Sequence, residues 1–122
     1  MRRAWKLMTT YKRGDVLLVR FPNVDWTSFK LRPALIVQSD ELKTEFRQRA
    51  AVSITSNLSR IGPSRIRINK DSSKARSMGL VLDSVVMTDR LVTIPEALFH
   101  KKIGRLEEME PVDQALKLVL GL

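Results

Sequence analysis

Two polar residues stand where predicted strands meet loops, and their side chains suit phosphate chemistry. Arg32 lies between a polar loop and an apolar segment that begins at Pro33, so its backbone should be fixed while its side chain faces the loop. A guanidinium there can bind a phosphate through two hydrogen bonds and hold its charge during a reaction. Thr55 ends another apolar segment, and its hydroxyl can donate to a phosphate oxygen or a 2′-hydroxyl. A rim ion pair and an ordinary strand residue would give the same pattern.

Asp89 is a third candidate, directly after the predicted strand 85–88. A carboxylate held near a phosphate pocket can accept a proton from a ribose hydroxyl. Arg90 follows it, so a structural ion pair at a turn is the other interpretation. Both interpretations remain open from the sequence alone.

The chain offers few other groups for catalysis or metal binding. It has no cysteine, which excludes disulfides, thiol catalysis and Cys-ligated metals. Its single histidine, His100, borders Lys101 and Lys102, should be exposed and receives no catalytic role. No phosphate-binding loop, dinucleotide motif or metalloprotease helix is present. We therefore predict neither a metal nor another cofactor.

Short strands must position the candidate residues. Apolar runs predict strands over 16–21, 34–37, 50–55, 85–88 and 91–94, with another over 101–105, and residues 64–69 alternate as a strand with one wet face does. A polar loop over 22–32 and a helical turn within 41–49 are expected between them. Pro111 and Gly121 bound a terminal helix, with an apolar face formed by Val112, Ala115, Leu116 and Val119. The pattern predicts a mainly β fold, a small curled antiparallel barrel with one helix packed on it.

The composition indicates a basic protein, and its charge either binds nucleic acid or only forms a solvated surface that keeps the protein soluble. Its 122 residues carry 22 Lys and Arg against 13 Asp and Glu, a net charge of +9. Such a field attracts a polyanion. We expect a basic leader over 1–12, a single domain over 13–122 and a cytoplasmic location, because no apolar run is long enough to span a membrane. Trp26 and Phe29, in the polar loop, can stack on unpaired bases or anchor the loop.

The order of several blocks resembles the MazF/PemK family of toxin endoribonucleases. These blocks are Gly14 to Pro22, Arg32 to Val37, Val52 to Ser56, Gly79 to Ile94 and the terminal segment from Val112, so the resemblance covers residues 11–122. It implies an SH3-like barrel of the MazF/PemK/CcdB type. It also implies a homodimer that cuts single-stranded RNA at a short sequence without a metal, inhibits translation and growth, and is neutralised by an acidic antitoxin. DNA would be contacted only through the antitoxin complex, and no membrane is involved.

The resemblance also implies the site. The family's active-site arginine and threonine fall on Arg32 and Thr55, and the aspartate that some members use as proton acceptor falls on Asp89. We expect further RNA contacts from Trp26, Phe29, Lys30, Ser56, Asn57, Arg65 and Arg67.

Two family positions differ in this chain. Thr27 replaces a glutamate of the loop, and Met87 replaces an arginine found two residues before the aspartate. The proton acceptor and the acid for the leaving group therefore stay open. A gyrase-inhibiting toxin of the same fold and a non-catalytic nucleic-acid-binding barrel are the alternative functions.

Overall fold

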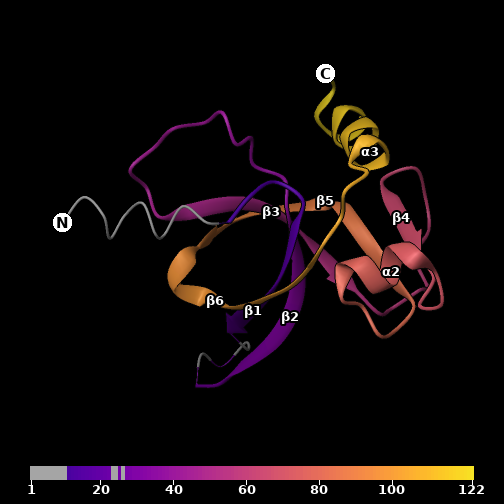
Figure 1. Cartoon of the computed structure of the whole chain (residues 1–122), viewed down its shortest axis with the longest axis horizontal. Helices are drawn as coiled ribbons and strands as arrows, with labels where there is room; N and C mark the ends of the chain where they lie inside the picture. Colours follow the sequence, from indigo (N-terminus) through magenta and orange to yellow (C-terminus); the bar gives the residue numbers. More distant parts are fainter. Residues whose placement is uncertain (1–10, 23–24, 26) are drawn as a thin grey trace.

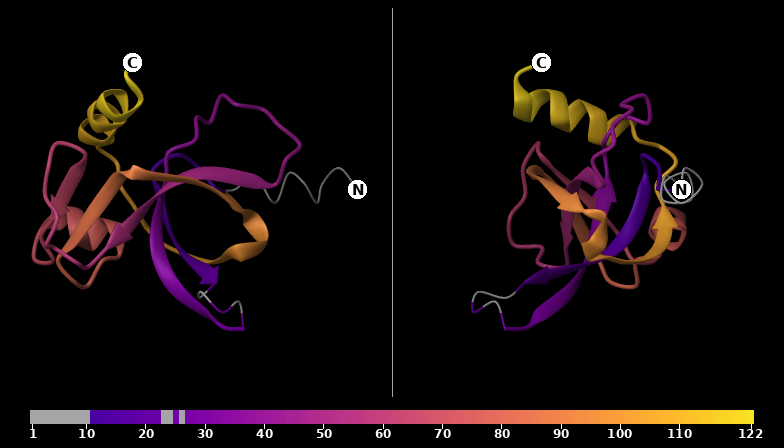
Figure 2. Two further views of the ribbon diagram at one scale, coloured as in Figure 1. Left: turned by 180° about the vertical axis from the view of Figure 1, so that it is seen from behind. Right: turned by 90° about the vertical axis from the view of Figure 1, so that its left-hand side faces the viewer.

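One antiparallel sheet with the strand order β4-β5-β3-β2-β1-β6 organises the molecule (Figure 1). The computed structural model describes residues 11–22, 25 and 27–122. Neighbouring strands pair throughout this order, so β4 and β6 form the two edges of a sheet that curls but does not close (Figure 2). The strands are β1 (Asp15–Pro22), β2 (Phe29–Ile36), β3 (Gln48–Thr55), β4 (Arg65–Ile68), β5 (Ser84–Pro95) and β6 (Phe99–Arg105).

Apolar side chains lie on both faces of the sheet. Within β2, Leu35 belongs to a core cluster that includes residues of both helices, α2 (Ser73–Met78) and α3 (Glu110–Leu120). Ala34 and Ile36 belong to a second cluster on the opposite face, as strand alternation requires. The second cluster comprises Leu17, Val19, Ala34, Ile36, Ala51, Ile94 and Phe99. In a regular strand, a residue two or four positions from a residue of the second cluster lies on the same face of the sheet as that cluster.

Both helices begin and end at residues suited to those positions. The Ser72 hydroxyl accepts a hydrogen bond from the N–H of Ala75 at 3.1 Å and caps α2. Gly79 ends α2 with φ 75°, and a Cβ there would lie 2.1 Å from a backbone oxygen of Ile103, so both conformation and packing require glycine. Gly121 ends α3 with φ 71°. No helix in the described residues is both long enough and apolar enough to cross a membrane.

The mainly β prediction with a C-terminal helix is confirmed, but some element bounds were wrong. β2 begins at Phe29, inside the segment predicted as a loop. The predicted strands 85–88 and 91–94 are one strand, β5, whose residues 88–90 bulge because pairing with β3 jumps from Met87 to Leu91. Residues 41–47 hold no helical turn, and α2 was not predicted because its six residues are too few to show a helical period.

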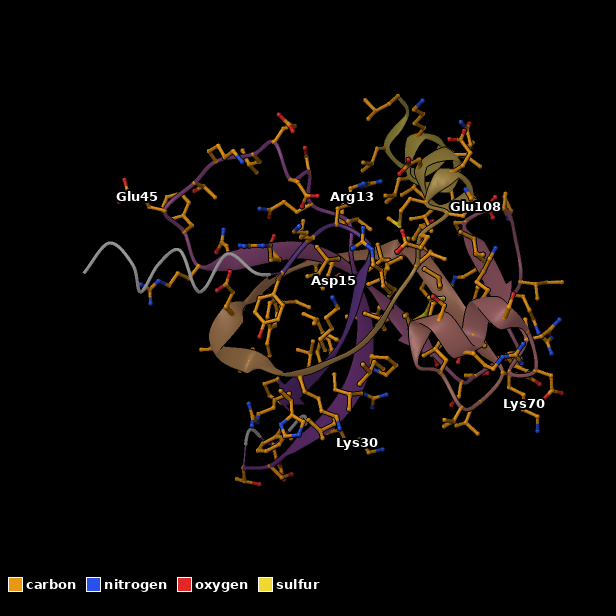
Figure 3. The ribbon with its side chains drawn as sticks, in the orientation of Figure 1. Arg13, Asp15, Lys30, Glu45, Lys70 and Glu108 are labelled. Carbon is orange, nitrogen blue, oxygen red and sulfur yellow. The ribbon has the colours of Figure 1, made fainter. Side chains whose placement is uncertain are left out.

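The start of β1 is fastened by two charged side chains at the centre of the molecule (Figure 3). Arg13 donates to the carbonyl oxygen of Val37 at 2.7 Å and forms an ion pair with Asp113 of α3. The fully buried carboxylate of Asp15 accepts from Arg105 of β6 at 2.9 Å and lies 3.2 Å from the Lys102 ammonium. Together they tie α3 and the edge strand β6 to the strand that leads toward the candidate site.

Candidate active site

Arg32 and Thr55 are aligned where β2 separates from β3. The last residue pair of the β2–β3 ladder joins Ala34 to Ser53. Arg32 and Thr55 lie two residues further along each strand, so the antiparallel register aligns them on one face. Pro33, next to Ala34, has no N–H with which to extend the ladder. On the N-terminal side of Pro33, β2 forms the hairpin with β1, whereas β3 continues toward α2 and β4 (Figure 1). A cation and a hydroxyl thus flank the opening between the two strands.

The hydroxyl of Thr55 is oriented by the turn that follows it. Its Oγ1 accepts a hydrogen bond from the N–H of Asn57 at 3.1 Å, and Oδ1 of Asn57 accepts from the N–H of Ser59 at 3.0 Å. Because these bonds use the oxygen of Thr55 only as an acceptor, its hydrogen can be donated to a ligand. Ser56 and Asn57 are exposed beside it.

The guanidinium of Arg32 has no acidic partner among the described residues. Its side chain is exposed, although Arg32 pairs in the β1–β2 ladder with the fully buried Val19. Lys30 lies two residues away on the same face and is also exposed, near the end of the hairpin (Figure 3). Two cations on one face of the hairpin make this side of the opening attractive to a phosphate.

Asp89 is paired with Arg65 of β4. Nε of Arg65 lies 2.8 Å from Oδ1 of Asp89, and Nη2 lies 2.9 Å from Oδ2, which is a two-pronged ion pair. The hydrogen bond from Arg65 lowers the pKa of Asp89, so the carboxylate is charged and a weaker base than usual. The neighbouring Arg90, the partner considered from the sequence, acts on Asp89 only through its charge.

The Arg65–Asp89 pair lies away from the aligned Arg32 and Thr55. Thr55 pairs with Val85 of β5, and Asp89 follows Val85 by four residues, within the bulge. At about 3.3 Å per residue this is roughly 13 Å of extended strand, which the bulge shortens. The structure therefore pairs Asp89 with Arg65, which lies on the same face as Thr55 but two strands away, in the row of Met87 and Ser53.

The other expected contact residues divide between the two faces. Val85 of β5 pairs with Arg67 of β4 on one side and with Thr55 of β3 on the other. Arg67 and Thr55 therefore lie in one row across the sheet, on the same face. Arg67 is exposed and lies 3.6 Å from the carboxylate of Asp83. Phe29 alternates with Lys30 and therefore lies on the face of the hairpin opposite Arg32. Trp26 and most of the basic leader lie outside the described residues.

Three residues near these positions were not singled out as site residues from the sequence. Ser53 is half-buried on the same face as Thr55, which strand alternation would have indicated once the bounds of β3 were known. Arg20 and His100 meet across 80 positions of the chain, and no local pattern could have predicted their contact. Within the described residues no group of three histidine, aspartate or glutamate side chains could hold a metal ion.

Several solved toxin structures share this fold. A mycobacterial endoribonuclease in complex with its cognate antitoxin gives a TM-score of 0.71 at 21% identity over 93% of this chain and 97% of that one. For the Mycobacterium tuberculosis toxin MazF-mt6 the TM-score is 0.64 at 22% identity over 86% and 97%. For MazE–MazF (form II) from Deinococcus radiodurans it is 0.70 at 14% identity over 92% and 96%. These likenesses show a common fold.

Sequence comparison assigns the family. No curated protein matches the chain. The family model of PemK-like, MazF-like toxins of type II toxin–antitoxin systems matches residues 12–120, nearly the whole sequence. The chain therefore belongs to the PemK/MazF toxin family.

Proposed function

We propose that the protein is a metal-independent endoribonuclease toxin that cleaves single-stranded RNA at a short preferred sequence. The observation that carries the proposal is the alignment of Arg32, which has no acidic partner in the described structure, with the oriented hydroxyl of Thr55 across the opening between β2 and β3. Family membership and the endoribonucleases among the similar structures support it. Cleavage of RNA would inhibit translation and growth.

The reaction uses the nucleophile that RNA itself carries. The 2′-oxygen attacks the adjacent phosphorus, the bond from phosphorus to the 5′-oxygen breaks, and the products are a 2′,3′-cyclic phosphate and a 5′-hydroxyl end. Arg32 stabilises the negative charge that builds up on the phosphorane, and it stays protonated throughout. Thr55 donates its hydrogen to a phosphate oxygen and orients the group. The 2′-hydroxyl proton passes to a base, and the departing 5′-oxygen takes up a proton.

The variant Asp89→Asn tests whether Asp89 is a structural ion-pair partner of Arg65 or the proton acceptor of the reaction. Arg65 lowers the pKa of Asp89 in the folded protein, so the charged pair stabilises the fold at every pH above the ordinary pKa of an aspartate. This stabilisation is lost as the pH falls through the lower pKa that Asp89 has in the folded protein. The pair is partly exposed, so we expect Asp89→Asn to lose at most about 1 kcal/mol at pH 7. This difference from the wild type should shrink as the pH falls below about 3.8, the ordinary pKa of an aspartate, as measured by urea unfolding.

Cleavage by Asp89→Asn should fall less than that by Arg32→Ala, because the ion pair lies away from the opening. A loss of activity as large as that of Arg32→Ala, with stability retained, would instead make Asp89 the proton acceptor.

The experiment that tests the function maps the 5′ ends formed from a long RNA in the presence of EDTA. We expect a few recurrent cleavage sites with 5′-hydroxyl ends. Thr55→Val keeps the shape of the side chain but removes the donor, and it should cost roughly 100-fold in rate, as loss of one transition-state donor does. Thr55→Ser keeps the hydroxyl and should restore most of the activity.

Other outcomes would favour the alternative functions. Binding of RNA that weakens steeply with salt, without any product, would indicate a non-catalytic nucleic-acid-binding protein. Inhibition of gyrase without RNA cleavage would indicate the other toxin class. Equal rates for Thr55→Val and the wild type would remove Thr55 from the mechanism.

The antitoxin and the homodimer belong to the same proposal. The net charge of +9 suits an acidic protein partner as well as RNA. Among the similar structures, a mycobacterial endoribonuclease is in complex with its cognate antitoxin. Co-expression with a short acidic protein encoded beside this chain should restore growth, and sedimentation of the purified toxin should show the dimer mass.

A further inference from the structure

A second cationic and aromatic group of side chains lies on the hairpin face opposite Arg32. Arg20 and Phe29, from β1 and β2, share this face because Arg20 pairs with Leu31 and Phe29 pairs with Pro22. The guanidinium of Arg20 lies 5.8 Å from the centroid of the Phe29 ring. Nη1 of Arg20 donates to the carbonyl oxygen of Phe99 at 3.3 Å, and Nη2 lies 3.0 Å from Nδ1 of His100. The β1–β2 hairpin and the start of β6, which are distant in sequence, therefore build this group.

The hydrogen bonds define what the group can offer to a ligand. A guanidinium only donates, so Nδ1 of His100 accepts and the neutral ring carries its hydrogen on Nε2, as a second donor. In the described structure no carboxylate pairs with Arg20, which is half-buried and held in place by a backbone carbonyl, the imidazole and the ring. An orientated cation without an acidic partner is suited to bind an anion.

A small hollow lies beside these residues. This hollow of about 220 Å³ is lined by Arg20, Pro22, Thr27, Ser28, Phe29 and Leu98. This is smaller than the ~300–1,000 Å³ usual for drug-sized ligands. Phe29, which is 55% exposed, contributes an aromatic ring. An exposed aromatic ring beside an arginine is the arrangement on which unpaired bases stack.

An RNA strand bound at Arg32 and Thr55 can reach this face, because β3 and β6 do not pair along the full length of the β1–β2 hairpin. β3 pairs with β2 only as far as Ala34, and β6 pairs with β1 only as far as Val19. The end of the hairpin is therefore a two-stranded ribbon with open edges, and it projects from the rest of the sheet (Figure 2). A single RNA strand can pass around such an edge, whereas a duplex is too wide and stiff to do so.

We infer that the hollow lined by Arg20 and Phe29, together with the His100 ring that is bonded to Arg20, binds a nucleotide of the substrate RNA that lies outside the cleaved step. The base stacks on Phe29, and the phosphate accepts hydrogen bonds from Arg20 and from Nε2 of His100. The inference rests on the proposed function, because it places this nucleotide on the same RNA strand that Arg32 and Thr55 hold.

The test compares a longer RNA with the minimal fragment that the wild type still cleaves. The longer RNA should have the lower KM, by about tenfold, because one stacked base contributes that much binding. Phe29→Ala and Arg20→Lys should abolish this advantage. Phe46→Ala is the matched control: Phe46 is 70% exposed, in the loop between β2 and β3, and its loss should preserve the advantage.

A fluorescence measurement separates failure of the inference from failure of the proposed function. With 2-aminopurine placed in turn at each position of one single-stranded RNA oligonucleotide, one position should be quenched on binding, and Phe29→Ala should abolish the quenching. If the wild type cleaves no RNA, the proposed function fails while the quenching still tests the subsite. Retention of both the KM advantage and the quenching in Phe29→Ala would overturn the inference. The inference would also be overturned if Phe29→Ala bound RNA as the wild type does but was no longer neutralised by the antitoxin. That result would assign this face to the protein partner.

Discussion

Replacing Arg32 by alanine should lower the rate of RNA cleavage by roughly 100- to 1,000-fold, the usual cost of removing a group that stabilises charge in a transition state. The side chain is exposed and no acidic residue of the described structure pairs with it, so its removal takes nothing from the core. We therefore expect the melting temperature to stay within about 2 °C of the wild-type value, as for most surface substitutions. Single-turnover cleavage of one defined RNA measures the rate.

Two further variants make the result specific. Arg32→Lys keeps the charge but loses the planar fork, so it should retain only part of the activity. Arg47→Ala is the control, because it removes the same charge from a residue just before β3. Thr55 is at the other end of β3, so about 25 Å of extended chain separates Arg47 from the site. Its cleavage rate should match that of the wild type. Equal activity of Arg32→Ala and Arg47→Ala would remove the catalytic assignment of Arg32.

Local sequence patterns predicted the elements that bury an apolar face. The apolar runs in β1 and β3 and the periodic face of α3 carry their own signal, because their side chains must reach a core. The first half of β2 carries no such signal. Residues 29–32 are all exposed, since this part of the strand projects beyond the core, and they were predicted as a loop. Arg32 was thus expected at a loop boundary, although it stands within a strand.

Contacts that depend on register could not be predicted from the chain alone. From the sequence, Asp89 was expected either in an ion pair with its neighbour Arg90 or near a phosphate; the structure gives it an ion pair, but with Arg65 on the adjacent strand, next to the bulge at 88–90. The same holds for Arg20 and His100, which meet only because β1 lies between β2 and β6. Residue types predicted the candidates, whereas pairing between strands decides which of them act together.

Loss of the Asp15 carboxylate should have the largest effect on stability. Its side chain is 0% exposed, and it accepts from Arg105 at 2.9 Å and from the N–H of Lys12 at 2.9 Å. Asp15→Ala leaves Arg105 and Lys102 without their shared anion. Removing one partner of a buried ion pair costs about 3–5 kcal/mol, and both cations here retain contact with water, so we expect about 3 kcal/mol. Urea unfolding at pH 7 measures the loss.

Asp40→Ala provides the matched control, because the carboxylate of Asp40 also accepts a backbone N–H, from Arg13 at 2.9 Å, but is exposed. Its loss should cost no more than about 1 kcal/mol, the usual contribution of one hydrogen bond. Replacing Arg105 by methionine as well should recover part of the excess cost of Asp15→Ala, since one of the two cations that Asp15 neutralises is then gone. Equal destabilisation by Asp15→Ala and Asp40→Ala would mean that the buried charge does not hold β1 to β6. The face that presents Arg32 would then depend on the apolar core alone for its position.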